Sequence, residues 1–505
     1  MSPIPELLPL DDYNAALLAN VHPPKWQNPE PAPSYHLVVV GAGTAGLVAA
    51  AGAAGLGARV ALVERHLMGG DCLNFGCVPS KSLIRSARAA AQVRRAPEYG
   101  LHLPGSVEVD FAEVMARLRR LRAHLSRHDA ASRFQQLGVD VFLGEGRFVG
   151  PRALEVAGKT LAFKRAVIAT GSRAALPHLP GLAEAGCLTN ETVFSLTARP
   201  RRLAVLGGGP IGCELAQAFQ RLGVEVTLLH RNDRLLNRED PEAAPILQET
   251  FVKEGMQLIL GCQLQGVERQ GAEKIIVYEH QGREGSLAVD EILVGLGRRP
   301  NLEGLNLDAA GVNYDRDGVL VNDYLQTSNP RIYAAGDVCL KYKFTHAADA
   351  AARLVLRNAL FWGRQKLSAL TIPYCIYTEP EVAHVGLKEK DAQDRGIPVQ
   401  TFTRPLSEVD RAVVDGEEAG LVKVLLKAGT DKILGATIVA PHAGEMINEI
   451  TLAMTARLGL GALARVIHPY PTRAEAVKQL ADTYYRSRLT PFLQKLIRRR
   501  LAWMR

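Results

Sequence analysis

Two cysteines, Cys72 and Cys77, stand with four residues between them in a stretch of small and apolar residues. An apolar run that predicts a helix follows Cys77, and a thiol at a helix N-terminus has a lowered pKa. By itself this spacing favours a structural disulfide or two reduced core cysteines. The nucleotide-binding pattern directly before the cysteines reverses that choice, and we interpret the pair as a disulfide that cycles between oxidised and reduced forms.

The nucleotide-binding pattern begins with residues 36–40, which predict a buried parallel strand. A Gly-x-Gly-x-x-Gly run, a helix of small residues over 47–56 and a second strand over 59–63 follow, and the second strand ends in Glu64. Such glycines let the backbone approach a pyrophosphate at the helix N-terminus, and the carboxylate accepts hydrogen bonds from ribose hydroxyls. The unit therefore predicts a bound dinucleotide. Its glycines are Gly41, Gly43 and Gly46.

The same pattern recurs further along the chain. A strand over 202–206 runs into a second glycine motif, which is followed by a helix over 213–222 and a strand over 224–229. Two such units indicate that two nucleotides are bound. The glycines of the repeat are Gly207, Gly209 and Gly212.

The cysteine stretch over 69–81 reads Gly-Gly-Asp-Cys-Leu-Asn-Phe-Gly-Cys-Val-Pro-Ser-Lys. It resembles the active-site signature of the flavin-dependent pyridine nucleotide-disulfide oxidoreductases. The resemblance covers about residues 36–480. It implies an α/β fold in which an NAD(P)-binding Rossmann-like domain is inserted in an FAD-binding one, with an α+β dimerisation domain after them. It also implies FAD and a nicotinamide nucleotide as cofactors.

Two further runs resemble flavin motifs of the family. Residues 169–172 mark the place where the chain leaves the flavin domain, and Asp337 is expected to contact the ribityl chain. A helix cap is the alternative for Asp337, because residues 346–358 predict a helix. The cofactor contacts expected from these runs and from the signature are Gly70, Thr170, Gly171, Ser172, Gly297 and Gly336.

The resemblance assigns roles around the cysteines. Cys77 is expected to be the thiolate beside the flavin, and Cys72 the interchange thiol that meets the substrate. Lys81 shares a helical face with Cys77 and is expected to pair with Glu214 near the flavin. An ordinary surface ion pair is the alternative for these two charges.

The second nucleotide site carries a clue to its ligand. His230 occupies the position that Glu64 holds in the first unit, and Arg231 and Arg234 follow it. Cationic side chains there favour a ribose 2′-phosphate, whereas a carboxylate repels it. We therefore expect NADPH rather than NADH, unless the two arginines are merely solvated loop charges.

The proton-transfer end departs from the family pattern. Many relatives carry His-Pro-Thr-x-x-Glu, but the run here starts at Tyr470 and ends at Glu475. A tyrosine with a pKa of about 10 is a donor rather than a base at neutral pH. His468 either substitutes as the base or is a packing histidine. Tyrosine at this place resembles mercuric reductases, although those carry a C-terminal cysteine pair and the last cysteine here is Cys375.

Composition limits the remaining possibilities. The chain has 505 residues and a net charge of +8, with an arginine cluster at 117–122 that we interpret as a solvated helix face. No nucleic-acid motif accompanies it, so no nucleic-acid partner is expected. Seven scattered cysteines and no apolar run of 18 residues predict a reducing, cytoplasmic location. No resident metal ion is expected.

We divide the chain by these patterns. The proline-rich arm is expected to lie on the surface, either partly disordered or packed across a partner subunit. The tail is basic and amphipathic, and two interpretations stay open: it contacts a membrane surface, or it packs on the protein's own dimer. The expected parts are an arm (1–35), an FAD-binding domain (36–190 and 298–366), an NAD(P)-binding domain (191–297), a dimerisation domain (367–481) and a tail (482–505).

The leading hypothesis is a homodimeric flavoenzyme of the mercuric reductase type. Electrons would pass from NADPH through FAD and the Cys72/Cys77 disulfide to a small-molecule, dithiol, disulfide or metal-ion acceptor. The first alternative is a dihydrolipoamide dehydrogenase or another disulfide reductase. The second is a membrane-associated, redox-sensing or quinone-linked flavoprotein with low turnover.

Overall fold

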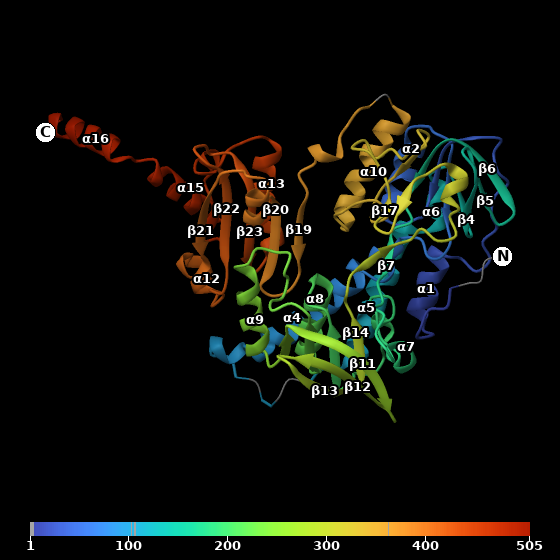
Figure 1. Ribbon diagram of the computed structural model, residues 1–505, viewed down its shortest axis with the longest axis horizontal. Coiled ribbons are helices and arrows are strands. Elements are labelled where there is room, and N and C mark those ends of the chain that lie inside the picture. The colour runs from blue at the N-terminus through green and yellow to red at the C-terminus, as the bar shows by residue number, and fades with distance from the viewer. Residues whose placement is uncertain (1–4, 103, 106–107, 362, 505) are drawn as a thin grey trace. The chain divides into compact units, whose positions relative to one another are not determined.

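The computed structural model describes residues 5–102, 104–105, 108–361 and 363–504. The chain forms two compact units (Figure 1). The first comprises Met1–Asp233 and Glu254–Ala369, and the second comprises Arg234–Lys253 and Leu370–Arg505.

A seven-stranded sheet forms the centre of the first unit. Its strands follow the order β3-β2-β1-β6-β5-β4, and β18 pairs with β6. The pairs β1/β2, β2/β3, β1/β6 and β6/β18 are parallel, and β4 and β5 are added antiparallel. The strands are β1 (Tyr35–Val40), β2 (Val60–Glu64), β3 (Val139–Leu143), β4 (Gly146–Gly150), β5 (Ala153–Val156), β6 (Lys159–Ile168) and β18 (Ile332–Ala334).

A second, four-stranded parallel sheet repeats this construction in the order β10-β9-β8-β14. Because β1 and β2 end together, as do β8 and β9, each glycine turn lies at the carboxyl edge of its sheet. The predicted α/β class with two nucleotide-binding units is confirmed. The strands are β8 (Arg202–Leu206), β9 (Glu225–His230), β10 (Gln257–Leu260) and β14 (Glu291–Val294), with an antiparallel sheet of β11 (Cys262–Gln270), β12 (Glu273–His280) and β13 (Arg283–Val289).

Helices position the functional segments of this unit. Helix α2 packs against α10, and α4 packs against both α5 and α8. The helices and short strands used below are α1 (Asp12–Val21), α2 (Thr44–Gly55), α3 (Gly70–Asn74), α4 (Cys77–Arg94), α5 (Phe111–Leu125), α8 (Pro210–Arg221), α10 (Thr345–Leu360), β7 (Ser172–Ala174) and β15 (Arg298–Pro300).

The N-terminal segment is built into its own chain. Leu17 and Val21 of α1 are fully buried. Further along, the Trp26 indole donates to the carbonyl of Val141, which lies in β3. The segment therefore packs as part of the first unit.

The interpretation of the arginine cluster as a solvated face is wrong for two of its members. Arg119 and Arg122 on α5 are only 6% and 3% exposed. Arg119 pairs with Asp11 at 2.5 Å, and Arg122 donates to the side chain of Asn14. The N-terminal segment supplies both partners, which is why the local sequence of α5 did not reveal the burial.

The second unit is centred on a five-stranded antiparallel sheet in the order β19-β20-β23-β22-β21 (Figure 1), which agrees with the α+β domain that the resemblance implies. Helix α13 packs on β20 and β23, and α15 packs on β21. Among the described residues, no helix combines the length and apolar character needed to cross a membrane. The elements are β19 (Pro373–Ile376), β20 (Glu381–Gly386), β21 (Val399–Pro405), β22 (Leu421–Lys427), β23 (Ile433–Ala440), α9 (Ala243–Lys253), α12 (Asp410–Val414), α13 (Ala443–Thr455), α15 (Glu475–Ser487) and α16 (Pro491–Trp503).

Candidate active site

The two cysteines of the signature lie on successive helices of the first unit. Cys72 lies within α3, Cys77 is the first residue of α4, and both are free thiols in this structure. The Cys77 sulfur lies 3.2 Å from the hydroxyl oxygen of Thr345, at the start of α10. The two sulfurs are therefore in the dithiol form.

The environment makes the two thiols unlike each other. A hydrogen bond from Cys72 lowers the pKa of Cys77 to about 6, with help from Thr345 and the positive charge of Lys81, although burial and Asp71 oppose the shift. The same hydrogen bond, together with burial, raises the pKa of Cys72. These pKa shifts favour a thiolate at Cys77 and a protonated thiol at Cys72.

Lys81 and Glu214 meet in an ion pair with an N–O distance of 2.7 Å. Lys81 lies one turn after Cys77 on α4, and Glu214 lies on α8. The Glu214 side chain is only 9% exposed, so this pair is not an ordinary surface ion pair. It holds a fixed positive charge near the thiolate.

Removing this charge tests its influence on the thiolate. We expect Lys81→Met to raise the pKa of Cys77 by about one pH unit, seen as a higher midpoint in the pH dependence of its alkylation. The shift should stay modest because the Lys81 side chain is 36% exposed and solvent screens its charge. The alkylation rate of Cys77 in the reduced protein, followed against pH, reports the midpoint. The exposed Lys341 serves as control through Lys341→Met, and equal midpoints in the two variants would contradict the role of Lys81.

The first glycine motif has space for a ligand at one glycine only. A Cβ atom on Gly41 would lie 2.4 Å from the carbonyl oxygen of Ala169, and one on Gly46 would lie 1.8 Å from that of Gly41. At Gly43 the nearest atom is the Cα of Gly70, 3.7 Å away. Gly43 precedes α2 and makes no side-chain cap, so the first N–H groups of the helix can bind a phosphate. This geometry fits the pyrophosphate of FAD.

Glu64 is held in place beside this motif. One carboxylate oxygen accepts the N–H of Ala42 at 2.6 Å, and the other accepts the N–H of His66 at 2.8 Å. Burial raises the pKa of Glu64, against the effect of these two hydrogen bonds. The carboxylate therefore has a fixed orientation at the end of β2, where the predicted ribose contact requires it.

A polar network joins the two flavin motifs. The Ser172 hydroxyl donates to the carboxylate of Asp337 at 2.6 Å, and Arg298 donates to the Ser172 oxygen at 2.7 Å. Arg298 also lies 3.2 Å from Asp71, the residue before Cys72. The alternative of Asp337 as a helix cap is wrong, because Phe344 is the N-cap of α10.

A hydrogen bond beside this network joins the segment after β6 to the segment after β15. The Thr170 hydroxyl donates to the carbonyl of Asn301 at 2.8 Å. Gly171, Gly297 and Gly336 have positive φ angles of +67°, +114° and +81°, which a side chain would strain. Thr170, Ser172, Asp337 and these three glycines thus all belong to the first unit.

The second glycine motif repeats the geometry of the first. A Cβ atom on Gly207 would lie 2.6 Å from the carbonyl oxygen of Gly295, and one on Gly212 would lie 1.9 Å from that of Gly207. A Cβ atom on Gly209, at the start of α8, would meet nothing within 4 Å. This second cradle fits the pyrophosphate of a nicotinamide nucleotide.

His230 takes the structural place of Glu64 in the repeat. Its Nδ1 atom accepts the N–H of Gly208 at 3.1 Å, as Glu64 accepts that of Ala42. Burial, and then Arg231, lower the pKa of His230, so the ring is neutral and supplies no cation. Arg231 is exposed, and Arg234 belongs to the second unit, where it donates to the carbonyl of Asn237.

The predicted proton-transfer residues lie in the second unit. Tyr470 is 71% exposed and donates to Asp410 at 3.0 Å, which raises the pKa of the phenol. His468 Nε2 lies 3.1 Å from both carboxylate oxygens of Glu449, and its Nδ1 atom faces a carbonyl oxygen. The structure pairs these side chains with Asp410 and Glu449 rather than with Glu475, the first residue of α15.

The sequence missed three contacts of the site: Thr345, Arg298 and Asn190, which donates to Asp71 at 2.9 Å. Only Arg298 carried a signal, because it directly follows Gly297 at the expected return into the flavin domain. The other two lie far from the cysteines in sequence and become neighbours only through the fold.

Comparison with known proteins identifies the family. Residues 35–352 match the model of the pyridine nucleotide-disulphide oxidoreductases, and residues 372–481 match the dimerisation domain of the same family. The chain belongs to this family. It is accordingly an FAD-dependent oxidoreductase that uses a nicotinamide nucleotide, and it carries the family's dimerisation domain.

The relatives of this oxidoreductase differ in substrate. A mercuric reductase of Staphylococcus aureus is 38% identical over 451 residues, which are 89% of this chain and 82% of that protein. A dihydrolipoyl dehydrogenase of Mycoplasma pneumoniae is 36% identical over 452 residues, covering 88% of this chain and 97% of that protein. The solved Cu(II) complex of the HOCl-induced flavoprotein disulfide reductase RclA from Escherichia coli is 27% identical, with a TM-score of 0.79 over 88% of this chain and 99% of that one.

Proposed function

We propose that this oxidoreductase is a homodimer that transfers electrons from NADPH, through FAD and the Cys72/Cys77 pair, to a thiophilic metal ion. The observation that carries the proposal is the unequal setting of the two thiols: Cys77 lies 3.2 Å from the Thr345 hydroxyl, and a hydrogen bond from Cys72 lowers the pKa of Cys77. Soft thiolate ligands suit soft metal ions. The mercuric reductase relatives and the Cu(II) complex of RclA support a metal-ion acceptor.

The protein residues manage charge and protons in this scheme. FAD, when bound, supplies the two-electron transfer from the nicotinamide. Two electrons and one proton convert the Cys72–Cys77 disulfide into the Cys72 thiol and the Cys77 thiolate. When the two sulfurs bind a divalent ion, Cys72 releases its proton. Transfer of two electrons from the two sulfurs to the ion re-forms the S–S bond and leaves the metal in its zero-valent state.

The proton-transfer end supports a metal ion over a dithiol substrate. Exchange with a dithiol needs a base that removes a thiol proton. Tyr470 is a donor to Asp410, and both ring nitrogens of His468 face acceptor oxygens. Tyr470 has no basic nitrogen, and both nitrogens of His468 are already engaged by oxygens, so neither side chain is placed as the base for dithiol exchange.

We propose NADPH over NADH as the electron donor. No carboxylate stands at the end of β9, where the neutral His230 leaves a 2′-phosphate unopposed. The adjacent Arg231 is exposed and available to it. We also propose a reducing, cytoplasmic location, supported by Cys213 and Cys262, which are buried as single thiols.

An acceptor assay on the purified, FAD-loaded enzyme tests the function. We expect Hg(II) with excess low-molecular-weight thiol to stimulate NADPH oxidation more than lipoamide, glutathione disulfide or a quinone does. NADPH should exceed NADH in kcat/KM by at least about tenfold, a factor that corresponds to about one charge-assisted contact.

Cysteine variants test the role of the signature, and the choice of acceptor and of nucleotide can each be contradicted separately. Cys72→Ala should lose the Hg(II)-dependent rate, whereas Cys187→Ala, which changes a cysteine outside the signature, should keep it. A higher kcat/KM for lipoamide would replace the metal ion with a dithiol substrate. Preference for NADH would contradict the cofactor assignment alone.

A further inference from the structure

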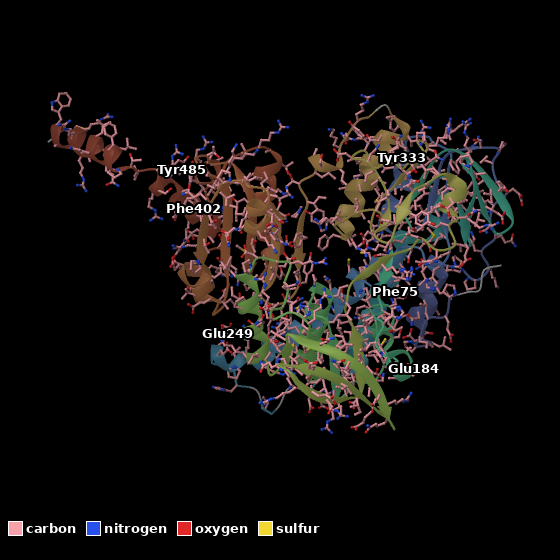
Figure 2. All side chains as sticks on the ribbon, viewed as in Figure 1. Phe75, Glu184, Glu249, Tyr333, Phe402 and Tyr485 are labelled. Carbon is pink, nitrogen blue, oxygen red and sulfur yellow. The ribbon has the colours of Figure 1, made fainter. Side chains whose placement is uncertain are left out.

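Helix α16 stands outside both regions that match the family. The dimerisation-domain match ends at residue 481, and α16 spans Pro491–Trp503. None of its residues is buried, and Figure 2 shows its side chains standing apart from those of the sheet in the same unit. Phe492 is 77% exposed and Trp503 is 90% exposed. The exposed apolar side chains of this helix indicate a partner surface.

All charged residues after Asp482 are basic. No aspartate or glutamate follows Asp482 in the sequence, whereas seven basic residues do. Pairing α16 with its own copy would therefore bring like charges together. The basic residues are Arg486, Arg488, Lys495, Arg498, Arg499, Arg500 and Arg505.

The helical period separates the two kinds of residue. At 100° per residue, one half of the surface is apolar and the other half carries Lys495, Arg498 and Arg499. Arg500 falls within the apolar half, where its long stem can extend past its neighbours and keep the charge in water. The apolar half consists of Phe492, Leu493, Leu496, Ile497, Leu501, Trp503 and Met504.

We propose that α16 binds the surface of an anionic lipid membrane. A helix with a basic face and an aromatic, apolar face lies in the interface, with the apolar side chains at the headgroup boundary and the cations near the anionic headgroups. Trp503 suits this boundary because its ring is apolar and its N–H is polar. In a homodimer two such helices would act together and strengthen the attachment.

Vesicle co-sedimentation of the full-length, FAD-loaded enzyme tests the proposal. Vesicles of phosphatidylcholine with phosphatidylserine should bind at least about tenfold more enzyme than vesicles of phosphatidylcholine alone, because several basic residues face the headgroups. Binding should weaken as salt is added. The double variant Arg498→Glu/Arg499→Glu and the double variant Phe492→Ala/Trp503→Ala should each lose most of the binding.

The controls separate a membrane from other occupants. Arg316→Glu changes an exposed arginine of the first unit and should leave binding unchanged. All variants should keep wild-type oxidoreductase activity, because none touches the active site. Deletion of residues 489–505 spares α15 and should abolish binding. Equal partition of the deleted and intact enzymes would overturn the proposal, as would a change of oligomeric state on deletion, because the helix would then serve a second copy of the chain.

Discussion

Cys77→Ala is expected to abolish acceptor reduction and to remove the thiolate, whereas Cys72→Ser is expected to abolish acceptor reduction and keep the thiolate. Both variants break the disulfide, so kcat/KM for the acceptor should fall by at least about 10³-fold in each. Only Cys77 has a lowered pKa, and the hydroxyl of a serine at 72 can still donate to its sulfur. The two cysteines should therefore differ in spectroscopic signature, although they are equally necessary for turnover.

The long-wavelength charge-transfer absorbance between a thiolate and bound flavin provides the measurement. In Cys72→Ser this band should disappear on acidification with a midpoint near 6, because the hydrogen bond that lowers the pKa of Cys77 to about 6 is kept. In Cys72→Ala the donor is lost and the midpoint should lie higher, because the Cys72 hydrogen bond is the largest cause of the lowered pKa. A band that persists in Cys77→Ala would refute the assignment of Cys77 as the thiolate.

The sequence predicted the nucleotide-binding units because their chemistry is local. Gly46 must be a glycine since a Cβ atom would strike the carbonyl oxygen of Gly41 within the same short turn, whereas a Cβ atom on Gly41 would strike that of Ala169 in a distant segment. In the repeat, Gly212 meets Gly207 in the same way, and Gly207 meets the distant Gly295. Strand, turn and helix therefore follow from a few neighbouring residues, without knowledge of the rest of the chain.

Contacts between distant segments were the part that the sequence could not predict. Thr345 reaches Cys77 across 268 residues of sequence, and no spacing rule links the two. His230 was identified only as the residue in place of an acid, and its burial beside Gly208 makes it a neutral acceptor. Charge on a side chain can be read from its type, whereas burial depends on what the fold places over it.

Arg122 shows how burial changes the meaning of a residue. One guanidinium nitrogen donates to the side chain of Asn14 at 2.5 Å, and another donates to the carbonyl oxygen of Asn74 at 2.8 Å. Asn74 ends α3, the helix that carries Cys72. Arg122 thus joins the N-terminal segment to the redox helix, and burial lowers its pKa to about 10.

Arg122→Ala is expected to destabilise the first unit by about 3 kcal/mol, because two buried acceptors lose their donor and a large side chain leaves a cavity. Arg122→Lys should restore only part of this loss, since a single ammonium group lacks the fork that reaches both oxygens. Urea unfolding, with FAD release as the signal, gives the urea concentration at the midpoint for each variant. Arg120→Ala, on the exposed side of the same helix, should change stability by no more than about 0.5 kcal/mol.

Proteolysis distinguishes the loss of the Arg122 contacts to the N-terminal segment from a general loss of stability. In Arg122→Ala the N-terminal segment loses a buried anchor, so trypsin should cut after Lys25 faster than in the wild type at urea concentrations where FAD stays bound. A matched destabilising change away from the segment, Phe251→Ala on α9 of the second unit, should lower global stability without this early cut. Equal cleavage rates after Lys25 in Arg122→Ala and wild type would show that Arg122 does not hold the segment in place, and the connection to the redox helix would then rest on the remaining contacts of α1.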